Sequence, residues 1–324
     1  MENENVITNE KVKVPMSRST KRRIFFWCAT AIPFALFALF YVYVVMQSFI
    51  NAFRIYTYKV GEVGWDIKFA GLDNFAKVIT MLRTGDNWMM ITNSIRLGLL
   101  KICIGTFVSM IFSYYVYKKL LFSGFFRVVL FMPSIISGLI MVLLFRYVAN
   151  DVYKVVFNQQ LGLLSNPKTT YGTILVYVLW LGFASEILMY TSAMGGINES
   201  VVESAQIDGV NVVQEMIFIT MPMIYPTVVT FIVAQLAAMF TDQMSLYTFY
   251  GSGAPSDVIT VGYMLYRDTL SSGKVPNRPW NEVLNTGVLS YAELTAFGLM
   301  ISVVMVPLTF LIRNLLERFG PSAD

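Results

Sequence analysis

Histidine is absent from this chain of 324 residues. Without an imidazole the chain has no Ser-His-Asp triad, no histidine metal site and no histidine proton relay, so many classes of enzyme are excluded. Cysteine is scarce too, because only Cys28 and Cys103 occur, and both lie in or near apolar segments. A disulfide framework is therefore not indicated, and we interpret both side chains as buried thiols.

A phosphate-binding loop of the form Gly-x-x-x-x-Gly-Lys-Ser/Thr is also missing from the sequence. The chain is therefore not an ATPase of that class. Its nearest glycine-rich stretch is Ser252–Pro255, which falls in a segment predicted to lie outside the membrane. We expect no phosphate-binding role there.

Charged residues make up only 14% of the sequence, whereas 56% of the residues are hydrophobic. This balance is typical of an integral membrane protein. The net charge of +4 is carried largely by the amino-terminal arm, which ends in the basic run Arg18–Arg23. We relate this charge to orientation in the membrane, and we expect no nucleic-acid partner.

Long apolar runs predict an all-α membrane protein with six transmembrane helices, since about 20 apolar residues suffice to cross a bilayer. The predicted spans are residues 24–53, 93–117, 126–148, 169–194, 218–240 and 294–312. Residues 1–23 would form a cytoplasmic arm, 24–315 the transmembrane domain and 316–324 a cytoplasmic tail. Segments 54–92, 149–168 and 244–292 would then lie outside. Basic residues at Lys118, Lys119 and Arg127, and again at Arg313 and Arg318, favour this orientation.

One predicted inner loop lacks basic residues, because no Lys or Arg occurs between Lys168 and Arg267. In this loop Ser200 and Glu203 have the spacing of a capping box, which predicts that a helix starts there. Gly209 adopts positive φ at little cost and suits the position just after a short helix. The loop therefore reads as a helix, a tight turn and a second helix.

The same loop resembles a hallmark of ABC importer permeases, specifically the carbohydrate-uptake branch that includes the maltose-type permeases. The family pattern is Glu-Ala-Ala, three residues, Gly, and later Ile-x-Leu-Pro. Here it stands as Glu203-Ser204-Ala205, Gly209 and Ile219-Thr220-Met221-Pro222, with Ser and Met as mild departures. Further similar stretches are Gly71–Phe75, Phe126-Arg127, Pro133 and Trp180–Phe183.

This resemblance implies a type I ABC importer permease fold with a cytoplasmic coupling helix at about 199–211. The coupling helix would dock into a partner ATPase through Glu203, Ser204, Ala205, Asp208 and Gly209, with Pro222 closing the motif. The implied partners are a second, homologous permease subunit, two ATP-binding cassette subunits and an extracytoplasmic solute-binding protein. ATP and Mg would bind to the cassette subunits, and this chain would bind no cofactor and catalyse no reaction. The implied location is the bacterial cytoplasmic membrane, with both chain ends in the cytoplasm.

Three polar patches on the predicted spans are candidates for the substrate pathway, since transporters bind substrate near the bilayer midplane. They are Ser134, Ser137 and Gly138 after Pro133; Gly182, Ser185 and Glu186; and Phe240, Asp242 and Gln243. The resemblance to maltose-type permeases implies that these residues contact a sugar.

Each patch also has a structural interpretation. Small residues such as Ser134 pack between helices, and an aromatic such as Phe240 anchors a span at the interface. Glu186 either contacts the substrate or pairs with a base such as Arg146, while Lys101 would extend its ammonium group toward the lipid headgroups.

A second class of function stays open on the residues alone. A secondary transporter or channel driven by an ion gradient could bind its ion at Glu186 or Asp242. Such a protein would have no need of the polar loop at 199–211. The sequence does not identify a sugar or its length.

Overall fold

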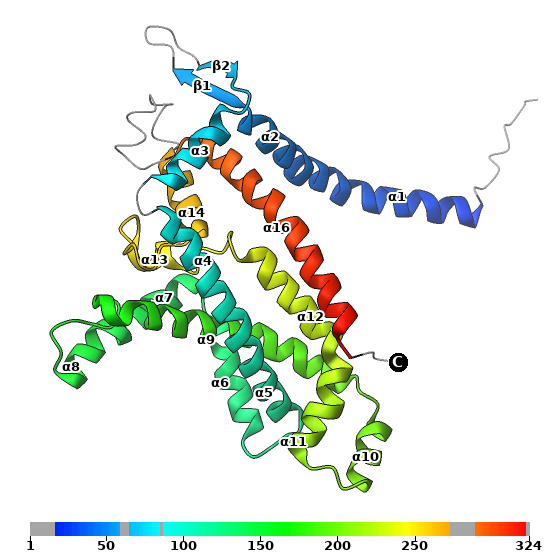
Figure 1. Cartoon of the computed structure of the whole chain (residues 1–324). Coiled ribbons are helices and arrows are strands. Elements are labelled where there is room, and N and C mark those ends of the chain that lie inside the picture. The colour runs from blue at the N-terminus through cyan, green and yellow to red at the C-terminus, as the bar shows by residue number, and fades with distance from the viewer. Residues whose placement is uncertain (1–16, 59–64, 85–86, 273–288, 322–324) are drawn as a thin grey trace, which may run out of the picture. The chain divides into compact units, whose positions relative to one another are not determined.

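The computed structural model describes residues 17–58, 65–84, 87–272 and 289–321. These residues are mainly helical, and the chain divides into two compact units, Met1–Ile50 and Asn51–Asp324. Figure 1 shows the order of the elements along the chain. The predicted arm at 1–23 and tail at 316–324 lie partly outside the described residues.

The first unit is one long apolar helix. It contains α1 (Arg18–Phe37), the wide turn η1 (Ala38–Val42) and most of α2 (Tyr43–Ala52). Together these elements form a run of 35 residues that is long enough to cross a membrane. The helix begins six residues before the predicted span, so the basic residues that follow Arg18 belong to its first turns.

A hairpin and a short helix open the second unit. Strand β1 (Arg54–Tyr58) pairs antiparallel with β2 (Trp65–Phe69), and α3 (Asp73–Arg83) follows. The buried Asn74 side chain donates hydrogen bonds to the carbonyl oxygens of Ala52 and Arg54, at 2.8 and 2.9 Å. These bonds hold α3 against the start of the hairpin.

Among the described residues of the second unit, four further helices are long and apolar enough to cross a membrane. The first joins α4 (Trp88–Leu100), η3 (Lys101–Gly105) and α5 (Thr106–Tyr117); the second is α9 (Pro167–Gly195); the third joins α11 (Val212–Glu215), η5 (Met216–Thr220) and α12 (Met221–Ala238); the last is α16 (Tyr291–Phe319). With the first unit, five of the six predicted spans are therefore confirmed as helices.

The predicted span at 126–148 is not one continuous helix, because this segment is broken into two helices. Helix α6 (Ser123–Ile135) ends two residues after Pro133, and α7 (Gly138–Tyr147) leaves at an angle of 108°. Helix α6 continues past Pro133, and the break falls at Ile136 and Ser137, whose backbones are extended. After α7 the chain continues through η4 (Val148–Val152) and α8 (Tyr153–Phe157), where the sequence predicted a loop.

The two cysteines are free thiols, but the prediction that they are buried is wrong, since both are exposed. Apolar neighbours in sequence do not bury a side chain on a membrane helix, because one face of that helix can point to lipid.

Helix α9 lies at the centre of the second unit, with α5, α6 and α12 packed along it. Near its start, Tyr177 packs against Phe145 and Phe249, with ring centroids 5.0 and 4.9 Å apart. Near its end, Tyr190 belongs to a second buried cluster that includes Tyr114. Figure 1 shows α13 (Leu246–Tyr250) and α14 (Val261–Ser272) on one side of this unit and α10 (Glu199–Ile207) on the other. We call the two ends of α9 the α13 end and the α10 end.

Candidate functional site

The polar loop forms two short helices at the α10 end. Helix α10 is followed by a turn at Gly209, whose φ of +81° confirms the predicted left-handed conformation, and then by α11. The predicted cap is wrong: the Asn198 side chain accepts from the Ser200 amide at 3.1 Å, so Asn198 rather than Ser200 caps α10. A capping box does occur, but it joins Asn211 and Gln214 at the start of α11.

Three of the predicted coupling residues, Glu203, Ser204 and Ala205, lie on α10, and Asp208 and Gly209 lie directly after it. Glu203, Ser204, Asp208 and Gly209 are exposed, whereas Ala205 is 7% exposed and points toward the protein. The Ser204 hydroxyl donates to the carbonyl oxygen of Ser200, and Pro222 lies in the first turn of α12. The exposed face is therefore acidic and carries the apolar side chain of Ile207, which is 86% exposed.

The Glu186 carboxylate lies inside the helix bundle and is 6% exposed. It accepts a hydrogen bond from the Gln235 side chain of α12 at 2.9 Å. The predicted pairing with Arg146 is wrong, because the Arg146 guanidinium donates to the carbonyl oxygen of Phe249 instead. Glu186 therefore joins α9 to α12, as a polar contact in an apolar setting.

A second polar contact inside the bundle is an ion pair. The Lys101 ammonium group lies 2.9 Å from the Asp242 carboxylate, which also accepts from the Met244 amide at 2.8 Å. The prediction that Lys101 extends toward the headgroups is wrong, because an acid on the chain just after α12 is within reach. The pair connects η3 with the turn that ends the fifth predicted span.

The remaining candidates of the substrate pathway do not converge on one point. Ser134, Ser137, Gly138 and Ser185 are exposed, and Gly182 is half-buried. Phe240 packs in two apolar clusters, while the side-chain oxygen of Gln243 is buried without a hydrogen-bond partner among the described residues. Within the described part of the chain, no hydrogen bond or ion pair links one of the three predicted patches to another.

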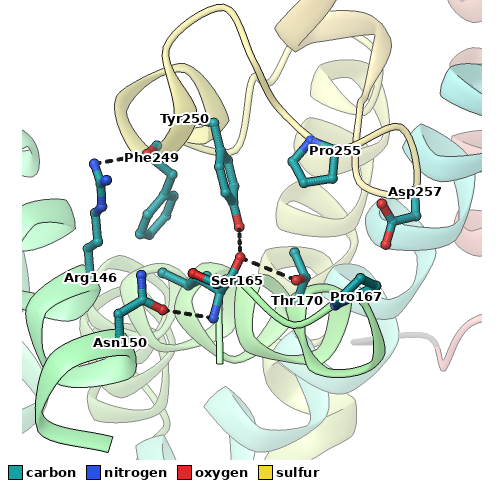
Figure 2. A pocket seen from close by; sticks show the side chains of 10 residues that line it. Arg146, Asn150, Ser165, Pro167, Thr170, Phe249, Tyr250, Pro255 and Asp257 are labelled. Atoms are coloured by element: carbon teal, nitrogen blue, oxygen red, sulfur yellow. Dashed lines mark hydrogen bonds between the residues drawn. The ribbon is translucent and has the colours of Figure 1, made fainter. Parts of the chain in front are cut away.

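A cavity of about 290 Å³ with both polar and apolar lining residues lies at the α13 end, and the sequence did not predict it (Figure 2). Three separate stretches line it: the end of α7 with η4, the turn that enters α9, and the chain from α13 to Asp257. The Tyr250 hydroxyl donates to the carbonyl oxygen of Leu164 at 3.1 Å, and Asn150 accepts from the Leu164 amide at the same distance. Burial raises the pKa of Tyr250 to about 12, and the Asp257 carboxylate adds to this shift.

Signals for the missed residues were present but ambiguous. Asn198 immediately precedes α10, and asparagine is among the strongest cap residues, yet Ser200 satisfied a familiar pattern. Lys101 lies in the middle of an apolar run, which calls for an acidic partner, but its partner is 141 residues away in the sequence. Nothing local identifies that acid.

Residues 101–323 match the family described as "Binding-protein-dependent transport system inner membrane component". The arabinooligosaccharides transport system permease protein AraP of Halalkalibacterium halodurans is 23% identical over 275 residues, which cover 80% of this chain and 84% of AraP. The lactose transport system permease protein LacF of Rhizobium radiobacter is 24% identical over 298 residues, which cover 86% of this chain and 97% of LacF.

A similar fold occurs in the crystal structure of a bacterial ABC transporter involved in the import of the acidic polysaccharide alginate. The TM-score is 0.72 at 18% sequence identity, and the match covers 93% of this chain and 98% of the other. This likeness confirms the predicted type I ABC importer permease fold. Since the family match spans about two thirds of the sequence, this chain belongs to the inner membrane components of binding-protein-dependent transport systems.

Proposed function

We propose that this chain is one of two membrane subunits of an ATP-driven importer for a sugar or an oligosaccharide. The observation that carries the proposal is α10, a capped helix with an exposed acidic face that holds Glu203 and Asp208. A rigid helix of this kind can insert into a groove on a partner, and its carboxylates can meet basic side chains there. The names of AraP and LacF support a carbohydrate as the substrate class.

In this proposal the α10 end faces the cytoplasm of a bacterium and docks to one of two ATP-binding cassette subunits, which bind ATP and Mg. A second, homologous membrane subunit completes the pathway. A solute-binding protein delivers the sugar at the α13 end, where the cavity with Asp257 and Arg146 lies. Closure of the ATPases displaces α10 and switches access from one side of the membrane to the other.

The pathway residues of the proposal are the polar groups inside the bundle. Asp242 is held by Lys101, and Glu186 by Gln235, so each acid is already oriented. A sugar hydroxyl can accept from the ammonium group or donate to a carboxylate without the loss of either contact. Ser134, Ser137, Gly138, Gly182, Ser185, Phe240 and Gln243 remain predicted pathway positions.

The substitution Gly209→Trp tests the role of α10. A tryptophan there is strained by the φ of +81° and adds bulk to the exposed face that would enter the ATPase. We expect the complex to insert in the membrane but to hydrolyse ATP without sugar uptake. The measurement is sugar accumulated per ATP hydrolysed in proteoliposomes that contain the whole complex and its binding protein.

Gly71→Trp is the matched control. Gly71 has a φ of +55° and open surroundings like Gly209, but it precedes α3. This variant should keep the wild-type ratio of sugar to ATP. Normal coupling in Gly209→Trp would refute the role of α10, and uptake driven by an ion gradient in this chain alone would refute the proposed function.

A further inference from the structure

An ion pair joins α11, the short helix that follows α10, to the end of α5. Lys118 is the residue directly after α5, and Glu215 is the last residue of α11. The Lys118 ammonium group lies 2.5 Å from the Glu215 carboxylate. The Glu215 side chain is 3% exposed and that of Lys118 is 17% exposed. A carboxylate buried this deeply is stable as an anion only beside a cation, so the pair constrains both helices.

A second contact joins the same two helices one turn earlier. The Tyr114 hydroxyl of α5 donates to the carbonyl oxygen of Val212, the first residue of α11, at 3.0 Å. The Lys118 ammonium group also lies 5.9 and 5.8 Å from the ring centres of Tyr114 and Tyr117, within the range of a cation–π contact. Helix α11 is therefore held at its first and last residues by the end of α5.

These contacts give α10 a route into the bundle that does not follow the chain. Along the chain, α10 connects to α9 on one side and, through α11 and η5, to α12 on the other. Helix α5 is far from α10 in sequence, yet its Tyr114 and Met110 pack in one cluster with Tyr190 and Met194 of α9. A displacement of α11 must either carry the end of α5 with it or separate Lys118 from Glu215.

We propose that Lys118 and Glu215 are positioning residues that transmit the displacement of α10 to α5 during transport. The inference rests on the proposed function, because it assumes an ATPase that moves α10. Helix α5 continues through η3 to Lys101, whose ammonium group holds Asp242. The ion pair thus connects the docking helix with the polar contact inside the membrane through one continuous helical span.

The test uses the whole complex in proteoliposomes and measures sugar accumulated per ATP hydrolysed. Glu215→Gln keeps the size of the side chain and removes its charge, and Lys118→Met removes the cation. We expect each to lower the ratio about tenfold, as for the loss of one coupled contact. The reversed pair Lys118→Glu with Glu215→Lys should return the ratio to within about threefold of wild type.

Lys119→Met is the matched control. Lys119 is the next residue, is exposed, and has no ion pair within the described part of the chain. The Lys119→Met variant removes one positive charge from the same loop as Lys118→Met, and it should leave the ratio of sugar accumulated to ATP hydrolysed unchanged. If the complex with Glu215→Gln does not assemble, the two lysine variants test the ion pair instead. Lys118→Arg keeps the positive charge and should keep the wild-type ratio, whereas Lys118→Met should lower it.

The failures are distinguishable. Variants that lower thermal stability but keep the wild-type ratio would show that the pair only stabilises the fold, and this result would overturn the inference. A reversed pair as poorly coupled as the single variants would overturn it too. A wild-type complex without ATP-dependent sugar uptake would refute the proposed function, and the inference with it.

Discussion

The two ends of α9 are held by different kinds of contact. At the α13 end the contacts run to main-chain atoms: Tyr250 and Asn150 both bond to the main chain of Leu164, and Arg146 donates to the carbonyl oxygen of Phe249. At the α10 end the Lys118–Glu215 ion pair is added to the hydrogen bond from Tyr114 to Val212. Hydrogen bonds to the main chain fix one geometry, whereas an ion pair acts over a longer distance and tolerates a change of angle.

In the proposed mechanism this difference assigns the movement to the α10 end. The α13 end also contains close backbone packing at Gly162, where a Cβ atom would lie 2.5 Å from the Cα of Asn150. No such restriction occurs at Gly209, around which the described structure leaves open space. In the proposed mechanism the α13 end is therefore the fixed part, and the α10 end is the moving part connected to it through α9 and α5.

Among changes that test this comparison, Gly162→Ala is expected to have the largest effect on stability. The new methyl group would overlap the Asn150 backbone, so the turn that enters α9 must shift. We expect a loss of about 3 kcal/mol in the free energy of unfolding, as for severe overpacking. Thermal unfolding of the purified complex measures it. Gly172→Ala, within α9 but with open space around it, should cost nothing; equal losses would contradict a tightly packed α13 end.

Tyr250→Phe should have a smaller effect at the same end. It removes the hydrogen bond to Leu164, which is worth about 1 kcal/mol. Because the pKa of Tyr250 is raised to about 12 from an ordinary value near 10, this stabilisation is full below pH 10 and is lost as the pH rises through 12. An ionised phenol can no longer donate to the carbonyl oxygen.

The measurement for Tyr250 is a spectrophotometric titration of tyrosinate in wild type and variant. The difference between the two curves should show one phenol that titrates near pH 12. A difference centred on pH 10 would mean that Tyr250 is neither buried nor bonded as described.

The smallest effect is expected at the α10 end, from Asn198→Ala. Loss of the cap should cost about 0.5 to 1 kcal/mol and loosen only the first turn of α10. Amide hydrogen exchange across α10 measures this, with the exchange of α9 as the internal reference. Ser200→Ala should change the exchange of α10 less than Asn198→Ala does, because the Ser200 hydroxyl does not cap the helix. A larger change in Ser200→Ala than in Asn198→Ala would instead support Ser200 as the cap.

Much of the architecture could be predicted because its causes are local. Apolar runs of sufficient length predicted five spans, since hydropathy depends on composition over a short window. The helix, turn and helix at Glu199–Glu215 were predicted as well, because Gly209 suits a positive φ whatever surrounds it. The cap failed on a choice between two neighbouring residues, Asn198 and Ser200, that both favour helix starts.

The sequence by itself determined the class of the protein, the number of its apolar runs and the position of the exposed acidic helix α10. Only the tertiary structure decided how the charges are used. Lys101 meets Asp242 and Lys118 meets Glu215 across 141 and 97 residues of chain. These pairs depend on which helices pack together around α9, and a buried charge accepts whichever partner the packing brings within a few ångströms. The acidic loop that stood out in the sequence is thereby connected, through α5, to the ion pair inside the membrane.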